Sequence, residues 1–267
     1  MTEFGGAAIL LVFLLGGSAL GMFVRPLLSE RHRNRETTDL IQLVMTMLVT
    51  FAALVLGLLT TSVKESFDTI ENDLRSVSIQ LIQLNRSLRQ YGSEADPARA
   101  LLRSYVAARI GETWPGQPKV HGEFDRAGPV PSDAGATPGS ARSSEMLAQV
   151  ETDIRGLVPQ DAMHRQLLQT CLNQFEVLMR ARWRLIEEAH GSISTPFYTV
   201  LTLWLVIIFA GFGLSAPGNT LSMVTIALGA LSIASVIFVI LDLDTPFTGL
   251  FTISSDPLRD ALYQLSR

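Results

Sequence analysis

Three long stretches of the chain contain no charged residue, and they decide what class of protein this sequence can form. They cover residues 4–24, 40–63 and 191–241. A helix needs about 20 apolar residues to cross a hydrocarbon core about 30 Å thick. The first two stretches therefore predict one transmembrane helix each. The third is too long for one span, and the segment SAPGN at residues 215–219 predicts a turn within it, because Pro and Gly interrupt helices.

The sequence thus predicts an all-α integral membrane protein with four transmembrane helices, at about residues 5–24, 40–63, 196–214 and 220–241. A cleaved signal peptide is the alternative for the first stretch. However, the N-terminus MTEF has no basic residue, and no small-residue cleavage site follows the apolar run. We therefore expect a retained span.

Four regions follow along the chain. We expect a first transmembrane pair at 1–63, an extramembrane helical hairpin at 64–194, a second transmembrane pair at 195–242 and a C-terminal docking tail at 243–267. A Pro- and Gly-rich segment at 114–140 interrupts the hairpin and predicts a loop.

Composition argues against several other classes of protein. The mean hydropathy of +0.30 is too high for an ordinary soluble domain. A net charge of −4 without a basic stripe gives no indication of nucleic-acid binding. The single cysteine, Cys171, excludes an intramolecular disulfide, and we expect a buried thiol. No catalytic motif appears, and His164 is more typical of an exposed or capping residue, so we expect neither enzyme activity nor a cofactor.

After the second span, apolar residues recur at alternating spacings of three and four. This heptad pattern is typical of a helix that packs along one seam, and it could also bundle several copies of the chain. The seam consists of Phe67, Ile70, Leu74, Val77, Leu81, Leu84, Leu88 and Tyr91. A new helix is predicted after it, with Asp96 as its N-cap and Pro97 at its first position.

Within the second span, small and hydroxylated residues share one helical face and lead to a lysine. We call this set the small-residue face: Thr46, Thr50, Ala53, Gly57, Thr60 and Lys64. Small residues let helices pack closely in a membrane. A ring of such faces around a symmetry axis would instead form a narrow pore lined by hydroxyl groups. In both cases we expect this face to meet protein rather than lipid.

The fourth span ends on two acids, Asp242 and Asp244. Acids at a helix C-terminus oppose the helix dipole, so another role is expected. They could be solvated, pair with an arginine of the hairpin, act as a hinge, or bind a cation. Two carboxylates are few for calcium, which takes 6–8 oxygen ligands. After them, Asp256 is predicted to cap a short last helix, and the apolar tail is expected to dock on the hairpin of this subunit or a neighbour.

Three segments resemble one known family. They are KESFDTIENDLRSVSIQLIQLNRSL after span two, LLRSYVAARI, and LDLDTPFTGLFTISSDPLRDAL after span four. Together they resemble the bacterial bestrophin-like domain family of four-span membrane proteins. The resemblance implies an oligomer like the bestrophins, which are pentameric anion channels whose second span lines the pore. It also implies that Asp242 and Asp244 occupy the place of the acidic calcium clasp of animal bestrophins, although this tail has no run of consecutive acids.

The membrane orientation has two opposing indications. Short loops rich in arginine stay in the cytoplasm, and the first loop holds Arg25, Arg31, Arg33 and Arg35. This places the hairpin and both termini on the non-cytoplasmic side of the bacterial inner membrane. The resemblance implies the cytoplasmic side for the hairpin.

Two functions remain from the sequence. One is a homo-oligomeric passive ion channel in the bilayer, with span two around its axis and an inorganic ion as its substrate. The alternative is a membrane-anchored structural or sensing protein without conductance.

Overall fold

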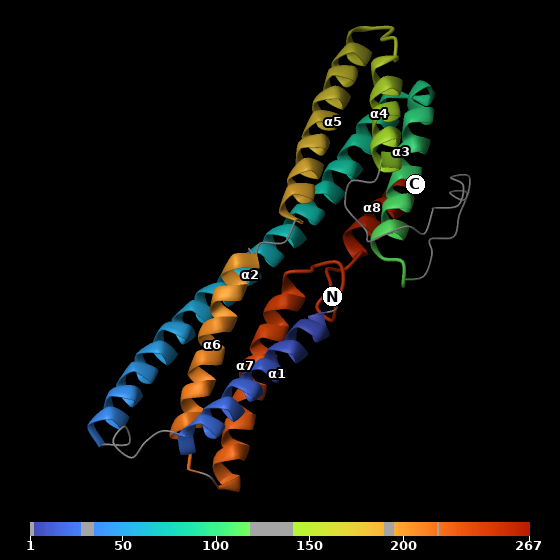
Figure 1. The fold of residues 1–267 in the computed structure, drawn as a ribbon. Coiled ribbons are helices and arrows are strands. Elements are labelled where there is room, and N and C mark those ends of the chain that lie inside the picture. The colour runs from blue at the N-terminus through green and yellow to red at the C-terminus, as the bar shows by residue number, and fades with distance from the viewer. Residues whose placement is uncertain (1–2, 28–34, 118–140, 190–194, 218) are drawn as a thin grey trace. The chain divides into compact units, whose positions relative to one another are not determined.

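The computed structural model describes residues 3–27, 35–117, 141–189, 195–217 and 219–267, and all regular structure in these ranges is helical (Figure 1). The helices are α1 (Glu3–Val24), α2 (Arg35–Tyr91), α3 (Asp96–Thr113), α4 (Ala141–Arg155), α5 (Ala162–Glu188), α6 (Thr195–Ser215), α7 (Thr220–Leu243) and α8 (Asp256–Leu265), with single 3-10 turns η1 (Arg25–Leu27) and η3 (Ser93–Ala95). The all-α prediction is confirmed. Most of the arginine-rich loop and of the Pro- and Gly-rich loop lies outside the described residues.

The chain forms two compact units. Unit 1 comprises residues 1–67 and 191–251, and unit 2 comprises residues 68–190 and 252–267. Helix α2 runs without interruption through the boundary at residue 67, so the second span continues as a stem helix, as the sequence predicts.

Unit 1 contains the four predicted spans. Among the described residues, the helices long and apolar enough to cross a membrane are α1, α2, α6 and α7. Each contains one of the predicted spans, and α2 continues far beyond its uncharged stretch. Their shared core contains Leu10 and Leu14 of α1, Leu205 and Ile208 of α6, and Ile237 of α7. Figure 1 shows α1 beside α6 and α7.

Helices α1 and α6 approach so closely that their contact requires glycine. A Cβ atom on Gly213 would overlap the backbone oxygen of Ser18, and a Cβ on Gly21 would overlap that of Ala210. Small residues at a contact let two backbones meet, which is how helices gain packing energy inside a membrane. The contact explains why glycine occupies positions 17 and 21 of α1.

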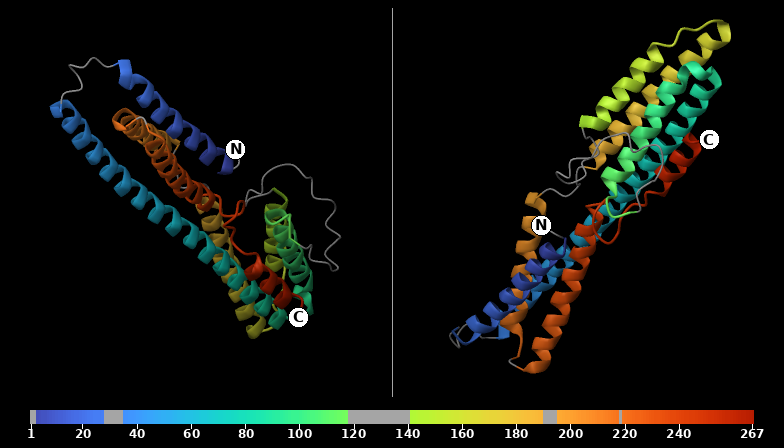
Figure 2. Two further views of the ribbon diagram at one scale, coloured as in Figure 1. Left: turned by 90° about the horizontal axis from the view of Figure 1, so that it is seen from below. Right: turned by 90° about the vertical axis from the view of Figure 1, so that its right-hand side faces the viewer.

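Unit 2 is built around the heptad seam. The seam residues from Ile70 to Tyr91 are all buried within this one chain. Figure 2 shows the helices of this unit, in which α3 lies against α4 and α8, and α4 against α5. The seam therefore stabilises the subunit itself and is not available to bundle copies of the chain.

The two predicted helix caps are wrong by one residue. Helix α3 has Ala95 as its N-cap, because the turn Ser93–Ala95 has already brought the chain into helical geometry; Asp96 lies in the first turn and pairs with Arg99. Helix α8 has Ser255 as its N-cap, and the side chain of Ser254 accepts the backbone N–H of Asp256. In both cases Pro still occupies the first turn, as expected.

Candidate functional site

Helix α2 turns different faces toward and away from its own subunit. The face that enters the core of unit 1 carries Ala52, Leu56, Leu59 and Val63. The small-residue face lies on another side of the helix. Thr46, Thr50, Ala53, Gly57 and Lys64 are exposed in the isolated subunit, and Thr60 is half-buried. The described part of the chain thus leaves this face uncovered.

The threonines of this face already use their hydroxyl hydrogens. Thr46 donates to the backbone oxygen of Gln42 at 2.8 Å, Thr50 to that of Thr46 at 2.9 Å, and Thr60 to that of Leu56 at 2.8 Å. These bonds to the preceding helical turn satisfy the donors inside the helix. The hydroxyl oxygens keep free lone pairs on the surface of α2, where they can accept from water or contact an ion.

Lys64 lies where the small-residue face ends. Its Nζ atom lies 5.4 Å from the centroid of the Phe67 ring, which is a cation–π contact, while the side chain remains exposed. Such a contact fixes the position of an ammonium group without removing its charge. The face therefore ends in a positioned positive charge.

The carboxylate of Asp242 holds the turn that follows α7. Asp242 is only 1% exposed, and it accepts hydrogen bonds from the backbone N–H groups of Leu250 at 2.9 Å and Phe251 at 2.7 Å. Gly249 has φ +102°, and a Cβ atom there would lie 2.9 Å from Cγ of Asp242. Only glycine suits this conformation and this close approach.

This geometry bears on the alternatives for the two acids. Asp242 is not a solvated stop residue, because it is buried. Both of its carboxylate oxygens face N–H donors, which a cation would have to displace. Among the described residues, no group of three or more His, Cys, Asp or Glu side chains could hold a metal ion. The residues around Asp242 and Asp244 therefore do not fit a calcium clasp. Asp242 instead fixes the backbone of the turn that follows α7.

The comparisons with known proteins agree with this architecture. The profile of the bestrophin-like domain matches residues 12–258. The chain belongs to the bestrophin-like family. No curated protein matches it.

Solved structures share the fold of this bestrophin-like chain. Two variants of a bacterial bestrophin homologue from Klebsiella pneumoniae align with TM-scores of 0.64 and 0.61, at 13% and 15% sequence identity, each over 97% of both chains. A further membrane protein aligns with a TM-score of 0.63 at 13% identity, over 99% of this chain and 98% of the other. At such identities the likeness establishes the fold alone.

The tail of this bestrophin-like chain docks on unit 2 through contacts that the sequence analysis missed. The indole Nε1 of Trp114 donates to the backbone oxygen of Ile253 at 2.8 Å. Arg259 donates to Ser255 at 2.9 Å and to Gln117 at 3.3 Å. The same subunit thus covers Ile253, Leu258 and Leu262 of the tail, whereas Leu250 and Phe251, for which we expected cover as well, are exposed. These contacts were not predicted, because Pro115 and Gly116 make the segment from Trp114 to Gln117 resemble an irregular loop without tertiary contacts.

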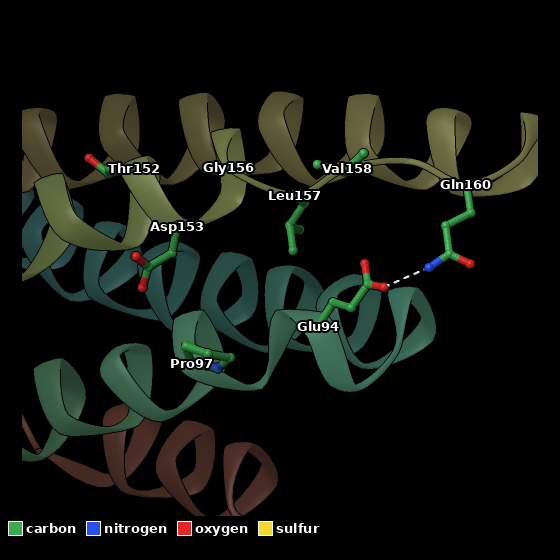
Figure 3. Close-up of a pocket in the computed structure, with 8 residues that line it drawn as sticks. All are labelled: Glu94, Pro97, Thr152, Asp153, Gly156, Leu157, Val158 and Gln160. Carbon is green, nitrogen blue, oxygen red and sulfur yellow. Dashed lines mark hydrogen bonds between the residues drawn. The ribbon is translucent and has the colours of Figure 1, made fainter.

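Unit 2 also carries an open groove of about 570 Å³, lined by Glu94, Pro97, Thr152, Asp153, Gly156, Leu157, Val158 and Gln160 (Figure 3). Gln160 donates to Glu94 at 2.8 Å across one end. The lining holds the carboxylates of Glu94 and Asp153 and the hydroxyl of Thr152, which donates to the backbone oxygen of Ala148 rather than to a carboxylate. We find no catalytic arrangement in it.

Cys171 is a buried thiol, as expected. It has no exposed surface, and burial raises the pKa of its thiol to about 11. Because the thiolate is the reactive form, this cysteine is inert at neutral pH.

Proposed function

We propose that this bestrophin-like protein is a homo-oligomeric passive ion channel in the bacterial inner membrane, with the small-residue face of α2 lining the axis. The supporting observation is the poor cover of α2 within its own subunit. Only 6% of its most apolar stretch is buried in the chain, compared with 28%, 33% and 22% for the spans of α1, α6 and α7. This helix is the one that most needs contacts from outside the subunit.

The chemistry of the exposed surface of α2 indicates which side of the helix would meet the axis. Bulky apolar residues at helical spacing, Met47, Leu54 and Leu58, form a sector of their own that suits lipid or a neighbouring subunit. The small-residue face offers hydroxyl oxygens and little bulk, which suits a narrow hydrated path. The family resemblance implies the same role for span two.

Ion flux into liposomes tests the proposal. We expect flux from the reconstituted protein. Gly57→Leu should reduce this flux at least several-fold, because the leucine side chain would project into a path that small residues line. The matched control is Val44→Leu, which adds one methylene at an exposed position outside the small-residue face. Both variants should be compared at equal reconstitution.

The alternative is a membrane-anchored structural or sensing protein. In that case the small-residue face serves subunit contacts only. Gly57→Leu would then change the oligomeric state in cross-linking, and wild-type liposomes would carry no flux under any voltage or ion gradient. That pair of results would reject the channel proposal.

The proposal includes the orientation predicted by the arginine-rich loop, with unit 2 on the non-cytoplasmic side. Ser93 of unit 2 is exposed, so Ser93→Cys can report it. Labelling by a membrane-impermeant maleimide in whole cells, with access through the outer membrane, supports this orientation. Labelling only after lysis contradicts it and supports the cytoplasmic side that the family resemblance implies.

A further inference from the structure

Two bulky apolar side chains stand exposed in the turn directly after α7. Leu250 is 66% exposed and Phe251 is 50% exposed, whereas Ile253, two residues later, is buried in unit 2. Isolated exposed apolar residues are common on proteins. The exposure of two adjacent bulky apolar residues on a turn with a fixed backbone calls for an explanation.

The turn is held in one conformation. Its backbone N–H groups at Leu250 and Phe251 are bonded to the buried carboxylate of Asp242, and Gly249 packs against the same carboxylate with φ +102°. A charged acceptor makes these hydrogen bonds stronger than neutral ones. The bonds to Asp242 therefore fix the backbone from which the exposed side chains of Leu250 and Phe251 project.

The end of α7 lies near the edge of the hydrocarbon core. The helix has 24 residues, which corresponds to a length of about 36 Å, slightly more than the core thickness of about 30 Å. Phe4 of α1, 62% exposed, packs its ring 4.6 Å from that of Phe238 in the last turns of α7, so this end of unit 1 already presents an apolar aromatic surface. Aromatic residues are typical of the interface between bilayer and water.

We propose that the turn from Asp242 to Phe251 is an interfacial anchor that inserts Leu250 and Phe251 into the bilayer surface. We assign lipid as the occupant, because the pair follows a membrane span after a short turn and belongs to the unit that contains the four spans. The exposed Thr248 and Thr252 flank the pair and supply hydroxyl groups for the headgroup region. Asp242 acts as the positioning residue that presents the pair.

Fluorescence quenching in liposomes tests the anchor. Phe251→Cys in the full-length protein is labelled with an environment-sensitive fluorophore, in a Cys171→Ala background. We expect blue-shifted emission, at least two-fold stronger quenching by phospholipids with a nitroxide near the headgroup than in the control, and little quenching by iodide. The matched control is Tyr263→Cys, an exposed position on α8 of unit 2, which should show water-like emission and iodide quenching. Leu250→Cys repeats the measurement at the second side chain.

A second variant examines the role of Asp242. Adding Asp242→Asn to the labelled Phe251→Cys protein should lower nitroxide quenching, because the turn loses its charged acceptor. Water-like emission from the labels at both position 250 and position 251, in protein that retains Asp242, would overturn the proposal. Protection of the label from both quenchers would also overturn the proposal if unlabelled Phe251→Cys copies form a disulfide with one another. That pair of results would identify a second subunit as the occupant. The measurement does not depend on ion flux, so it can fail or succeed independently of the channel proposal.

Discussion

The carboxylate of Asp242 accepts the backbone N–H of Phe251 at 2.7 Å, and this bond ties the last turn of α7 to the start of the tail. The relationship explains the first of the two acids at the end of α7. The first acid is not solvated but serves as a buried acceptor for a turn that has lost the regular hydrogen bonds of the helix.

Replacing Asp242 by asparagine should destabilise the protein by about 1.5–3 kcal/mol, the range for a lost hydrogen bond to a charged group. Thermal unfolding in detergent measures the effect, with Asp260→Asn on the exposed side of α8 as the control. Calcium and a chelator should leave the midpoint of the wild type unchanged. A calcium-dependent rise in the midpoint that disappears in Asp242→Asn would show that the carboxylate binds a cation instead.

The backbone contact between α1 and α6 predicts a sharp difference between two glycines. Gly213→Ala should destabilise unit 1 by about 1–3 kcal/mol, because its Cβ must push α6 away from Ser18. Gly16→Ala in α1 has open space around the new Cβ atom and should be neutral or slightly stabilising. Equal midpoints for the two variants in thermal unfolding would mean that the helices do not meet as closely as described.

Trp114 should hold the tail on unit 2. Trp114→Phe keeps most of the ring but leaves the buried backbone oxygen of Ile253 without its donor, which should cost about 1–3 kcal/mol. Hydrogen exchange of α8 should become faster in this variant. Trp183→Phe is the control, because Trp183 is 58% exposed. Unchanged exchange in Trp114→Phe would rule out this role.

The start of α5 predicts a pH-dependent contribution to stability. The backbone N–H of His164, and then its side chain, lower the pKa of Asp161, the N-cap of this helix. A carboxyl whose pKa is lower in the folded state stabilises the fold above its unfolded-state pKa, about 4, and loses that contribution as the pH falls through the folded-state pKa. Asp161→Ala should therefore lower the midpoint at pH 7, and its difference from wild type should shrink below about pH 4. A difference that stays constant from pH 7 to pH 3 would contradict this cap.

Much of the fold follows from local pattern. The uncharged stretches define α1, α6, α7 and the first part of α2, and the alternating spacing from Ile70 to Tyr91 defines the buried seam of unit 2. Membrane thickness and helical periodicity act over a few turns, so they can be recognised in a single sequence.

The remaining contacts depend on residues far apart or on backbone groups. Trp114 and the oxygen of Ile253 are 139 residues apart, and a backbone acceptor has no signature in the sequence. The partners of Asp242 are also backbone groups, eight and nine residues away, so the spacing of the acids did not predict them. The small-residue face of α2 was found by its spacing, but spacing alone does not say whether it meets lipid, a second subunit or an ion.

The central claim, that this face lines an ion path, is tested most directly by thiol modification during flux. Ala53→Cys and Leu54→Cys are compared in liposomes, in a Cys171→Ala background, before and after a charged water-soluble thiol reagent. Both positions are exposed and lie at the same depth, but successive residues point about 100° apart around a helix. The channel proposal predicts that modification at position 53 strongly reduces or blocks flux, while modification at position 54, on the bulky apolar sector of α2, has little effect. Unchanged flux at position 53 together with block at position 54 would contradict it.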